Sequence, residues 1–209
     1  EMLTRPEYFR AAVMGLKGNL KERWFIKKLK NKGFLVQEPS EAYSKYDCIV
    51  GTNSVRVQVK GTSKNMCDVS KGKIGVEIMG THGRFPKRGY KKSMIDCVAI
   101  IISENQIPQN FIKQKGLQFI IIPVEDLPLH YKIGNGHDFN NLIWDESENS
   151  DVIYPNIKLK IEKNNEKIFF TPDIESYKTF KGYKTIPENS EFRNSGPYYL
   201  NHIPSKFNN

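Results

Sequence analysis

Helical periodicity at the N-terminus gives way to a series of short apolar runs along the 209-residue chain. The first 32 residues predict helix, with Thr4 as the N-terminal cap and Gly33 as the stop. Gly15 and Gly18 are candidate interruptions of this helix. A helical segment, whole or broken, is therefore expected before the first strand.

Several short apolar runs after the helix predict the strands of a sheet. Two of them, residues 95–102 and 117–123, are almost continuously apolar, which is typical of strands covered on both faces. Helix, strands and mixed connections in this order favour an α/β or α+β core in which helices flank a central mixed sheet. The other strand predictions are residues 34–39, 46–50, 55–61 and 74–79.

The pattern changes beyond residue 130. Residues 157–170 predict a β-hairpin that turns at Asn164-Asn165, and most of the remainder has weak periodicity. We therefore expect a core of residues 1–129 and a C-terminal extension of residues 130–209, which would serve oligomerisation or add contacts to a ligand.

Composition excludes several classes of protein. With 38% hydrophobic and 11% aromatic residues the chain is globular, and no run approaches the roughly 20 apolar residues of a membrane span. Residues 1–10 lack the apolar middle of a signal peptide, so a soluble, cytoplasmic protein without a membrane partner is expected. Cys48, Cys67 and Cys97 fit neither a disulfide framework nor a zinc site, and buried thiols are expected.

The net charge of +9 is unevenly distributed. Residues 1–129 hold 22 Lys/Arg against 12 Asp/Glu, a balance of +10, whereas residues 130–209 hold 10 against 11, a balance of −1. A basic excess confined to one region is typical of a surface that binds a polyanion. A lysine-rich solvated surface would give the same composition.

The strand at residues 55–61 has one apolar and one polar face. Gln58 and Lys60 share the polar face because side chains alternate with period two, and a hairpin would bring Asp47 alongside them. A carboxylate, an amide oxygen and an ammonium together suit a hard cation such as Mg²⁺, which needs only one or two carboxylates plus a substrate phosphate. These are also the elements that phosphodiester cleavage requires.

Glu22 adds a second carboxylate. It precedes Phe25, Ile26 and Leu29 at helical spacing, so it lies on the apolar stripe that should face the sheet. A carboxylate there needs a cation or hydrogen-bond donors. A partner such as Arg56 or Lys60, or escape to solvent at the edge of the stripe, would also explain it.

This combination resembles the PD-(D/E)XK nucleases, whose signature is an acid followed, on the next strand, by an acid or Gln, any residue, and Lys. In this chain the residues that match the signature are "YD", which ends at Asp47, and "QVK" at residues 58–60, with Glu22 upstream. The proline of the usual Pro-Asp pair is absent, and Gln58 replaces the second acid. A Gln-x-Lys core with a helix Glu is similar to the intron-encoded homing endonucleases of this superfamily, over roughly residues 16–128.

The resemblance implies a restriction-endonuclease-like core, Mg²⁺ as cofactor with Mn²⁺ as a substitute, and catalytic roles for Glu22, Asp47, Gln58 and Lys60. Asp47 would be the central metal ligand and Glu22 a second one. Gln58 and the carbonyl of Val59 would add neutral oxygens. Lys60 would orient or activate the attacking water and stabilise the developing charge.

Residues 81–92 form a basic, acid-free stretch in which Phe85 and Tyr90 are interleaved with lysines and arginines. As a loop or ribbon it could contact DNA phosphates or read guanine edges, although a solvated basic loop is the simpler alternative. The candidate DNA-binding residues are Arg84, Lys87, Arg88, Lys91 and Lys92.

The expected function is a Mg²⁺-dependent endonuclease that cuts double-stranded DNA at a specific site. Because one such site cuts one strand, we expect a homodimer or homotetramer. A type II restriction endonuclease, a Holliday-junction resolvase and an inactive DNA-binding module of the same fold are the alternatives. A basic nucleoprotein component that binds RNA is a further alternative, but the sequence contains no RNA-binding signature to support it.

Overall fold

The computed structural model describes most of the core and two parts of the C-terminal region. Thr4 is outside the described residues, as are the central residues of the region after 130. The described residues are 6–41, 44–62, 67–82, 85–90, 92–108, 111, 115–127, 129–130, 152–153, 156–173 and 196–208.

The N-terminal segment is one continuous helix, α1 (Pro6–Asn31), so Gly15 and Gly18 do not interrupt it. Each glycine costs about 1 kcal/mol relative to alanine, and the flanking helix-forming residues tolerate this. Gly33, at φ 87°, follows the helix and donates its N–H to the carbonyl of Lys30. The predicted stop is therefore confirmed, because a left-handed residue here closes the last turn.

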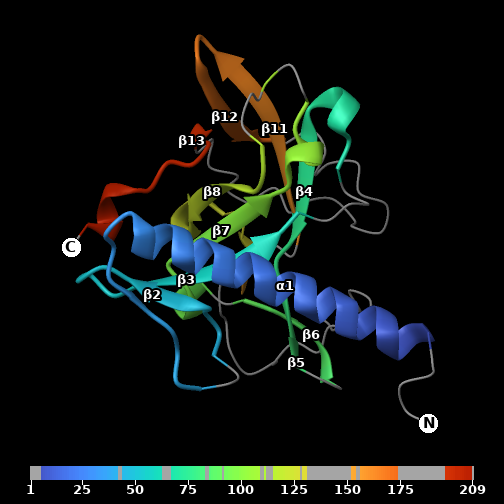
Figure 1. The fold of residues 1–209 in the computed structure, drawn as a ribbon, viewed down its shortest axis with the longest axis vertical. Coiled ribbons are helices and arrows are strands. Elements are labelled where there is room, and N and C mark those ends of the chain that lie inside the picture. Colours follow the sequence, from blue (N-terminus) through green and yellow to red (C-terminus); the bar gives the residue numbers. More distant parts are fainter. Residues whose placement is uncertain are drawn as a thin grey trace.

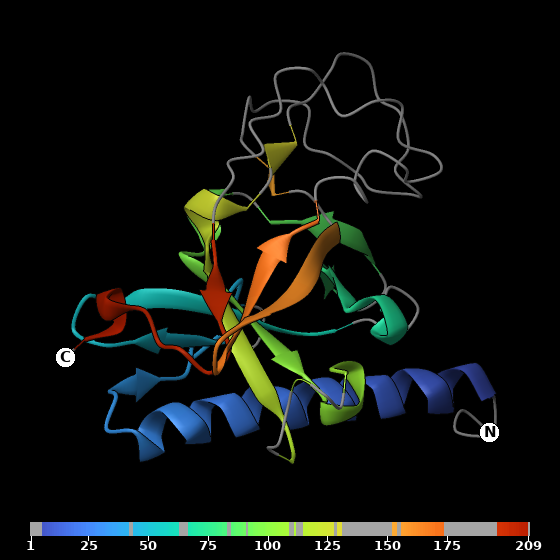
Figure 2. The ribbon, with the colours of Figure 1, turned by 90° about the horizontal axis from the view of Figure 1, so that it is seen from above.

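Among the residues of α1 whose burial is described, 12–31, those that pack into the core lie in the C-terminal half. Phe25, Ile26 and Leu29 are buried, as their helical spacing predicts. In the other half, Met14 is 65% exposed and Leu16 62%. Figure 2 shows α1 running along one side of the molecule, with its N-terminal end extending past the strands of the central sheet. No helix among the described residues is long and apolar enough to span a membrane.

The central sheet has five strands in the order β1-β2-β3-β7-β8 (Figure 1). It is mixed, since β3 and β7 run parallel and the other neighbours run antiparallel. The strands predicted from the two continuous apolar runs are β7 and β8, which are buried over nearly all their length. The strands are β1 (Val36–Gln37), β2 (Cys48–Val50), β3 (Val55–Gly61), β7 (Cys97–Ile102) and β8 (Gln118–Pro123).

A second, four-stranded sheet has the order β13-β12-β11-β4. The predicted hairpin is confirmed as β11 and β12, but its central turn residues are Asn165 and Glu166, one position later than expected, because Asn164 still pairs with Lys167. Asn165 adopts φ 53°, which asparagine tolerates. The strands are β4 (Lys73–Glu77), β11 (Asn156–Asn164), β12 (Lys167–Pro172) and β13 (Tyr198–Tyr199).

Two short antiparallel pairs complete the described strands. The β5–β6 ribbon overlaps residues 81–92, which were expected to form a loop or ribbon, but it begins earlier, at Met79. The other pair is β9–β10. Their bounds are β5 (Met79–His82), β6 (Phe85–Gly89), β9 (Leu129–His130) and β10 (Val152–Ile153).

The two sheets and α1 form successive layers. Along β7, Cys97, Ala99 and Ile101 pack with α1, while the alternating residues Val98 and Ile100 pack with the second sheet. The expectation of helices on both faces is therefore wrong in the described residues: a sheet covers the face opposite α1. The fold is mixed α/β. Burial on both sides explains why β7 is apolar throughout.

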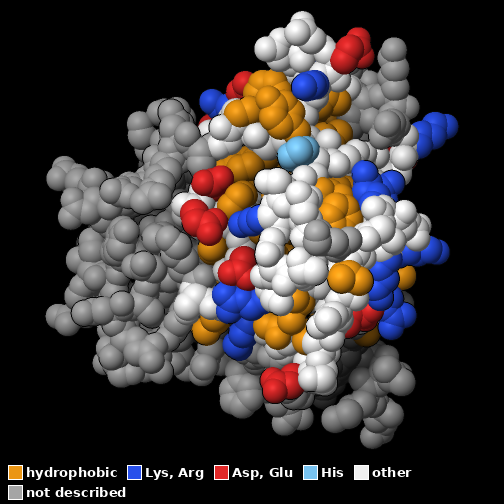
Figure 3. Space-filling view, turned by 90° about the vertical axis from the view of Figure 1, so that its left-hand side faces the viewer, with side chains coloured by type: hydrophobic (Ala, Val, Ile, Leu, Met, Phe, Trp, Pro, Cys, Tyr) orange, Lys and Arg blue, Asp and Glu red, His pale blue; other side chains and the backbone are white. Residues whose placement is uncertain are grey.

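Residues 196–208 run from the second sheet to the turn between β2 and β3. Tyr198 packs in the core between the sheets, and Phe207 is fully buried in the core beneath α1. Figure 3 shows this side of the molecule, where acidic and basic side chains are interspersed with hydrophobic ones. Both sides of the predicted boundary at residue 129 thus contribute to the second sheet, since β4 precedes it and β11–β13 follow it. A separate role for residues 130–209 stays a prediction.

The cysteines are free thiols. Cys48 and Cys97 are buried in β2 and β7, as expected, and burial raises the pKa of the Cys97 thiol to about 11. Cys67 is only partly buried. None of this suggests a reactive cysteine.

Candidate active site

Asp47 lies immediately before β2 and continues the contact between β2 and β3 with its side chain. Its backbone N–H donates to the carbonyl of Val57 at 2.9 Å. Its Oδ2 atom accepts hydrogen bonds from the backbone N–H of Val59, at 2.7 Å, and from Nε2 of Gln58. The carboxylate therefore occupies the place that a longer β2 would fill.

The second half of β3 has an open edge at this point. β2 pairs only with Val55–Val57, whereas β7 pairs along the other edge from Val57 to Gly61. Among the described residues, no strand pairs with the β2-side edge of residues 58–61. Because the edge is open, side chains from α1 and from the residues before β2 can converge there.

Glu22 reaches the same region from α1. It is about half-buried, and its pKa is raised to about 7, first by burial and second by the negative charge of Asp47. The positive charge of Lys60 opposes this increase only weakly. Arg56 pairs with Asp96 instead, so it is not the partner of Glu22.

The pKa of Asp47 is also raised, chiefly because the carboxyl group is buried. The hydrogen bond from Val59, the charge of Lys60 and the hydrogen bond from Gln58 partly offset this effect. The charge of Asp47 thus raises the proton affinity of Glu22, burial raises that of both carboxyl groups, and the neighbouring cations do not offset these effects fully.

Lys60 lies on the same face of β3 as Gln58, as the alternation predicts. Its Nζ is 5.2 Å from the centre of the Tyr90 ring, within the range of a cation–π interaction. Tyr90 is 6% exposed and follows β6 directly, and both burial and the charge of Asp47 raise its pKa. Sequence analysis placed Tyr90 in the basic stretch and missed its contact with Lys60.

The residues present suit a hard divalent cation in some respects. No group of three or more His, Cys, Asp and Glu side chains that could hold a metal occurs in the described parts of the chain. The donors would be two carboxylates and neutral oxygens, a set that Mg²⁺ accepts when substrate and water complete its shell. A bound cation would also remove the mutual repulsion of Glu22 and Asp47, so the donor chemistry fits.

Gln58 is arranged differently from the expected metal ligand. Its Nε2 atom donates both to Asp47 and, at 3.3 Å, to the carbonyl of Val59. In this arrangement the amide stabilises the Asp47 carboxylate as a donor. For Gln58 to ligate the same cation as Asp47, its amide would have to turn and present the oxygen instead.

The candidate DNA-binding residues lie in or next to the β5–β6 ribbon. Arg84 and Lys91 are outside the described residues. The backbone is described for Lys87 and Arg88, in β6, and for Lys92, in a 3₁₀ helix after it. Their contact with DNA stays a prediction, although Tyr90 joins this stretch of chain to Lys60.

Sequence analysis also missed Lys21, the neighbour of Glu22. Its side chain is about half-buried and lies against the backbone of Gly61, and burial lowers the pKa of its ammonium group. A basic residue beside the helix carboxylate and a glycine directly after Lys60 were the available signals.

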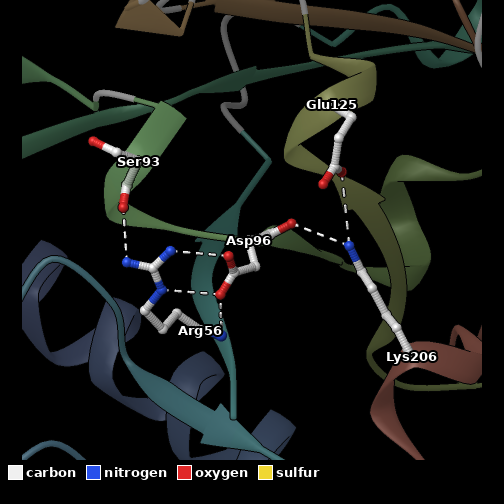
Figure 4. Close-up of polar contacts among 5 residues, drawn as sticks. All are labelled: Arg56, Ser93, Asp96, Glu125 and Lys206. Atoms are coloured by element: carbon white, nitrogen blue, oxygen red, sulfur yellow. Dashed lines mark hydrogen bonds and ion pairs between the residues drawn. The ribbon is translucent and has the colours of Figure 1, made fainter. Parts of the chain in front are cut away.

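The beginning of β3 carries a different polar cluster (Figure 4). Arg56 donates from Nε and Nη2 to the two carboxylate oxygens of Asp96, each at 2.9 Å, and its backbone N–H donates to the same carboxylate. The Arg56 hydrogen bond lowers the pKa of Asp96. Lys206, from the C-terminal segment, donates to the Asp96 carbonyl at 3.3 Å and pairs with Glu125 at 3.7 Å.

Comparisons with known proteins include a distant structural similarity. No protein-family model and no curated protein matches the chain. Part of the structure is similar to that of a bacterial homing endonuclease, I-Ssp6803I, with a TM-score of 0.39 and 20% sequence identity. The similar region covers 53% of this chain and 69% of that chain.

Proposed function

We propose that the chain is a Mg²⁺-dependent endonuclease that hydrolyses phosphodiester bonds of double-stranded DNA. The observation that carries the proposal is the meeting of Glu22 and Asp47, from different elements, beside Lys60 at the open edge of β3. Two incompletely neutralised carboxyl groups next to a fixed cation form a site for a metal ion and a phosphate. The resemblance of the Asp47, Gln58 and Lys60 pattern to PD-(D/E)XK nucleases supports the same conclusion.

Each residue has a role that follows from its position. Asp47 and Glu22 would hold the metal, with Gln58 and the Val59 carbonyl as neutral donors. Mg²⁺, when bound, polarises a phosphate and lowers the pKa of a bound water. Lys60 would stabilise negative charge on the phosphate and orient the attacking water, and the Tyr90 ring keeps its ammonium on this face.

Double-stranded DNA is the proposed substrate because the basic stretch 81–92 includes Tyr90, whose ring contacts Lys60. Its candidate phosphate-binding residues are Arg84, Lys87, Arg88, Lys91 and Lys92. One site of this kind cuts one strand, so a double-strand cut at a specific sequence requires a homodimer or homotetramer. The proposed activity is homing-endonuclease-like, and a restriction endonuclease or a junction resolvase would use the same chemistry.

A supercoiled-plasmid cleavage assay tests the proposal. The wild-type protein is compared in Mg²⁺ and in EDTA with Asp47→Ala, and with Glu166→Ala as a control for loss of an exposed carboxylate in the β11–β12 turn. We expect nicking or linearisation that requires Mg²⁺, is lost in Asp47→Ala and is retained in Glu166→Ala. Mn²⁺ should restore activity in place of Mg²⁺.

Substrate choice separates the alternatives. Preference for a four-way junction over linear duplex would indicate a resolvase. Because a plasmid can lack a rare target, a library of random duplex sequences is the second substrate. If the protein binds duplex DNA but cleaves neither plasmid nor library, the proposed endonuclease activity is contradicted, and an inactive DNA-binding module is the remaining alternative.

A further inference from the structure

Lys21 places a second ammonium group at the end of β3, on the other side of the strand from Lys60. Gly61 follows Lys60 directly and, with Val57 and Val59, belongs to the positions that face α1. A β-carbon built on Gly61 would lie 3.0 Å from Cδ and 3.2 Å from Cε of Lys21, and closer still to Nζ. The lysine side chain therefore occupies the space that any larger residue at position 61 would fill.

The ammonium of Lys21 lacks a carboxylate partner among the described residues. The ionisable groups that influence its pKa there are the Cys67 thiol, which raises it, and the ammonium of Lys17, which lowers it. Exposed lysines are usually solvated, but the Lys21 side chain is about half-buried and its aliphatic part is held against backbone. Its side chain is consequently held against Gly61 at the end of β3, next to Glu22 in sequence.

We infer that Lys21 and Gly61 form a phosphate-binding subsite for the DNA backbone, distinct from the catalytic cluster of Glu22, Asp47, Gln58 and Lys60. The inference rests on the proposed function. Lys60 faces the phosphate to be cleaved. Lys21, on α1, lies against Gly61, one residue farther along β3 than Lys60 and on the other side of the strand, and binds a neighbouring phosphate of the same DNA strand. Gly61 is required because a side chain there would displace the Lys21 ammonium.

Binding to a fluorescent duplex of mixed sequence, measured by anisotropy in EDTA at several salt concentrations, tests this subsite without cleavage. Lys21→Met removes the charge but keeps most of the aliphatic side chain, and we expect the affinity to fall about tenfold at moderate salt. The slope of log affinity against log salt should decrease by about one, as for a single lost phosphate contact. Lys27→Ala is the matched control, because Lys27 is exposed and lies on a different side of α1.

Gly61→Ala provides the second, independent variant. It leaves every charge in place but moves the Lys21 ammonium, so it should weaken binding and leave thermal stability nearly unchanged. In the Lys21→Met background, Gly61→Ala should have no further effect on binding, since the two changes remove the same contact. Lys21→Arg should retain the salt slope of the wild type.

The outcomes separate the two proposals. If the wild type binds duplex DNA and Lys21→Met binds with the same affinity and slope, the subsite is wrong and the endonuclease proposal is unaffected. Additive losses from Lys21→Met and Gly61→Ala would also contradict the subsite. If the wild type does not bind duplex DNA at all, the proposed function fails and the subsite fails with it.

Discussion

The two ends of β3 carry carboxylates in opposite electrostatic situations. At its beginning, Asp96 receives three hydrogen bonds from Arg56, and its pKa is lowered. Toward its end, Asp47 is more deeply buried and has no equivalent partner, so its pKa is raised. Residues of the same strand therefore bind one neighbouring carboxylate that stabilises the fold and another whose ionised form burial disfavours.

This difference separates structural from functional polar groups. Evolution normally pairs or removes a buried charge, because an uncompensated one destabilises the protein. A carboxylate that stays under-neutralised beside a second one, Glu22, is more easily explained by a ligand that completes the site. The predictions below test this comparison, from the largest expected change in stability to the smallest.

Truncating Phe207, which packs in the core near the beginning of β3, should have the largest effect on stability. Phe207 is fully buried, so Phe207→Ala should lower the free energy of unfolding by about 3–5 kcal/mol. Tyr199→Ala, which truncates an aromatic residue of the same segment that is 39% exposed, should change it by less than about 1 kcal/mol. Urea denaturation measures the free energy of unfolding of both variants. If the loss in Phe207→Ala is as small as that in Tyr199→Ala, the packing of Phe207 does not stabilise the core.

Neutralising each carboxylate tests the comparison directly. Asp96→Asn breaks the two-point contact with Arg56 and should lower the free energy of unfolding by about 1–2 kcal/mol, since the pair is partly exposed. Asp47→Asn keeps an oxygen for the Val59 N–H and removes a buried charge. Its stability in EDTA should therefore equal or exceed that of the wild type.

The same pair has opposite effects on activity. Cleavage should be lost in Asp47→Asn and retained in Asp96→Asn, when both are assayed below their unfolding temperatures. A destabilised Asp47→Asn protein would mean that this carboxylate is structural, and the contrast between the two ends of β3 would disappear.

Local sequence patterns were sufficient to predict much of this arrangement. Alternation along residues 55–61 places Gln58 and Lys60 on one face whatever surrounds the strand, and helical spacing places Glu22 beside Phe25 and Ile26. Continuous apolar runs identified β7 and β8 because burial on both sides leaves no polar position. These features depend only on the period of the element.

Features that depend on distant partners were not predictable in this way. The second sheet joins β4 to β11, and nothing local to either strand specifies that pairing. The orientation of the Gln58 amide follows from its contact with Asp47, and Arg56 pairs with Asp96 rather than Glu22 only because β7 lies beside β3. Tyr90 and Lys21 were missed for the same reason.

Replacing Gln58 by Glu should sharpen the contrast further. Gln58→Glu removes the amide donor to Asp47 and places a third carboxylate in the cluster, so stability in EDTA should fall by about 1–2 kcal/mol. Mg²⁺ should then raise the melting temperature more than in the wild type, because the added charge strengthens metal binding. Gln37→Glu, the same substitution at an exposed position in β1, is the control. A Mg²⁺ effect no larger than that of the wild type would contradict a metal site that includes residue 58.

The smallest effect is a pH dependence that the end of β3 should impose on stability. In the metal-free protein the pKa of Glu22 is raised from 4.5 to about 7, so between these values the folded state binds more protons than the unfolded state. Stability should therefore decrease as pH rises from about 4.5 to about 7. Asp47, with its raised pKa, contributes in the same direction.

Urea denaturation across this pH range, in EDTA, compares the wild type with Glu22→Gln. The substitution should flatten the pH dependence, because it removes the carboxyl group whose proton affinity changes most on folding. Glu166→Gln, an exposed glutamate in the β11–β12 turn, should leave the slope almost unchanged. Saturating Mg²⁺ should also flatten the wild-type curve, because a bound cation favours the ionised form that the metal-free fold opposes. If neither Glu22→Gln nor Mg²⁺ alters the dependence of stability on pH, the carboxyl group with the raised pKa lies elsewhere. Glu22 would then be an ordinary carboxylate at the edge of the apolar stripe.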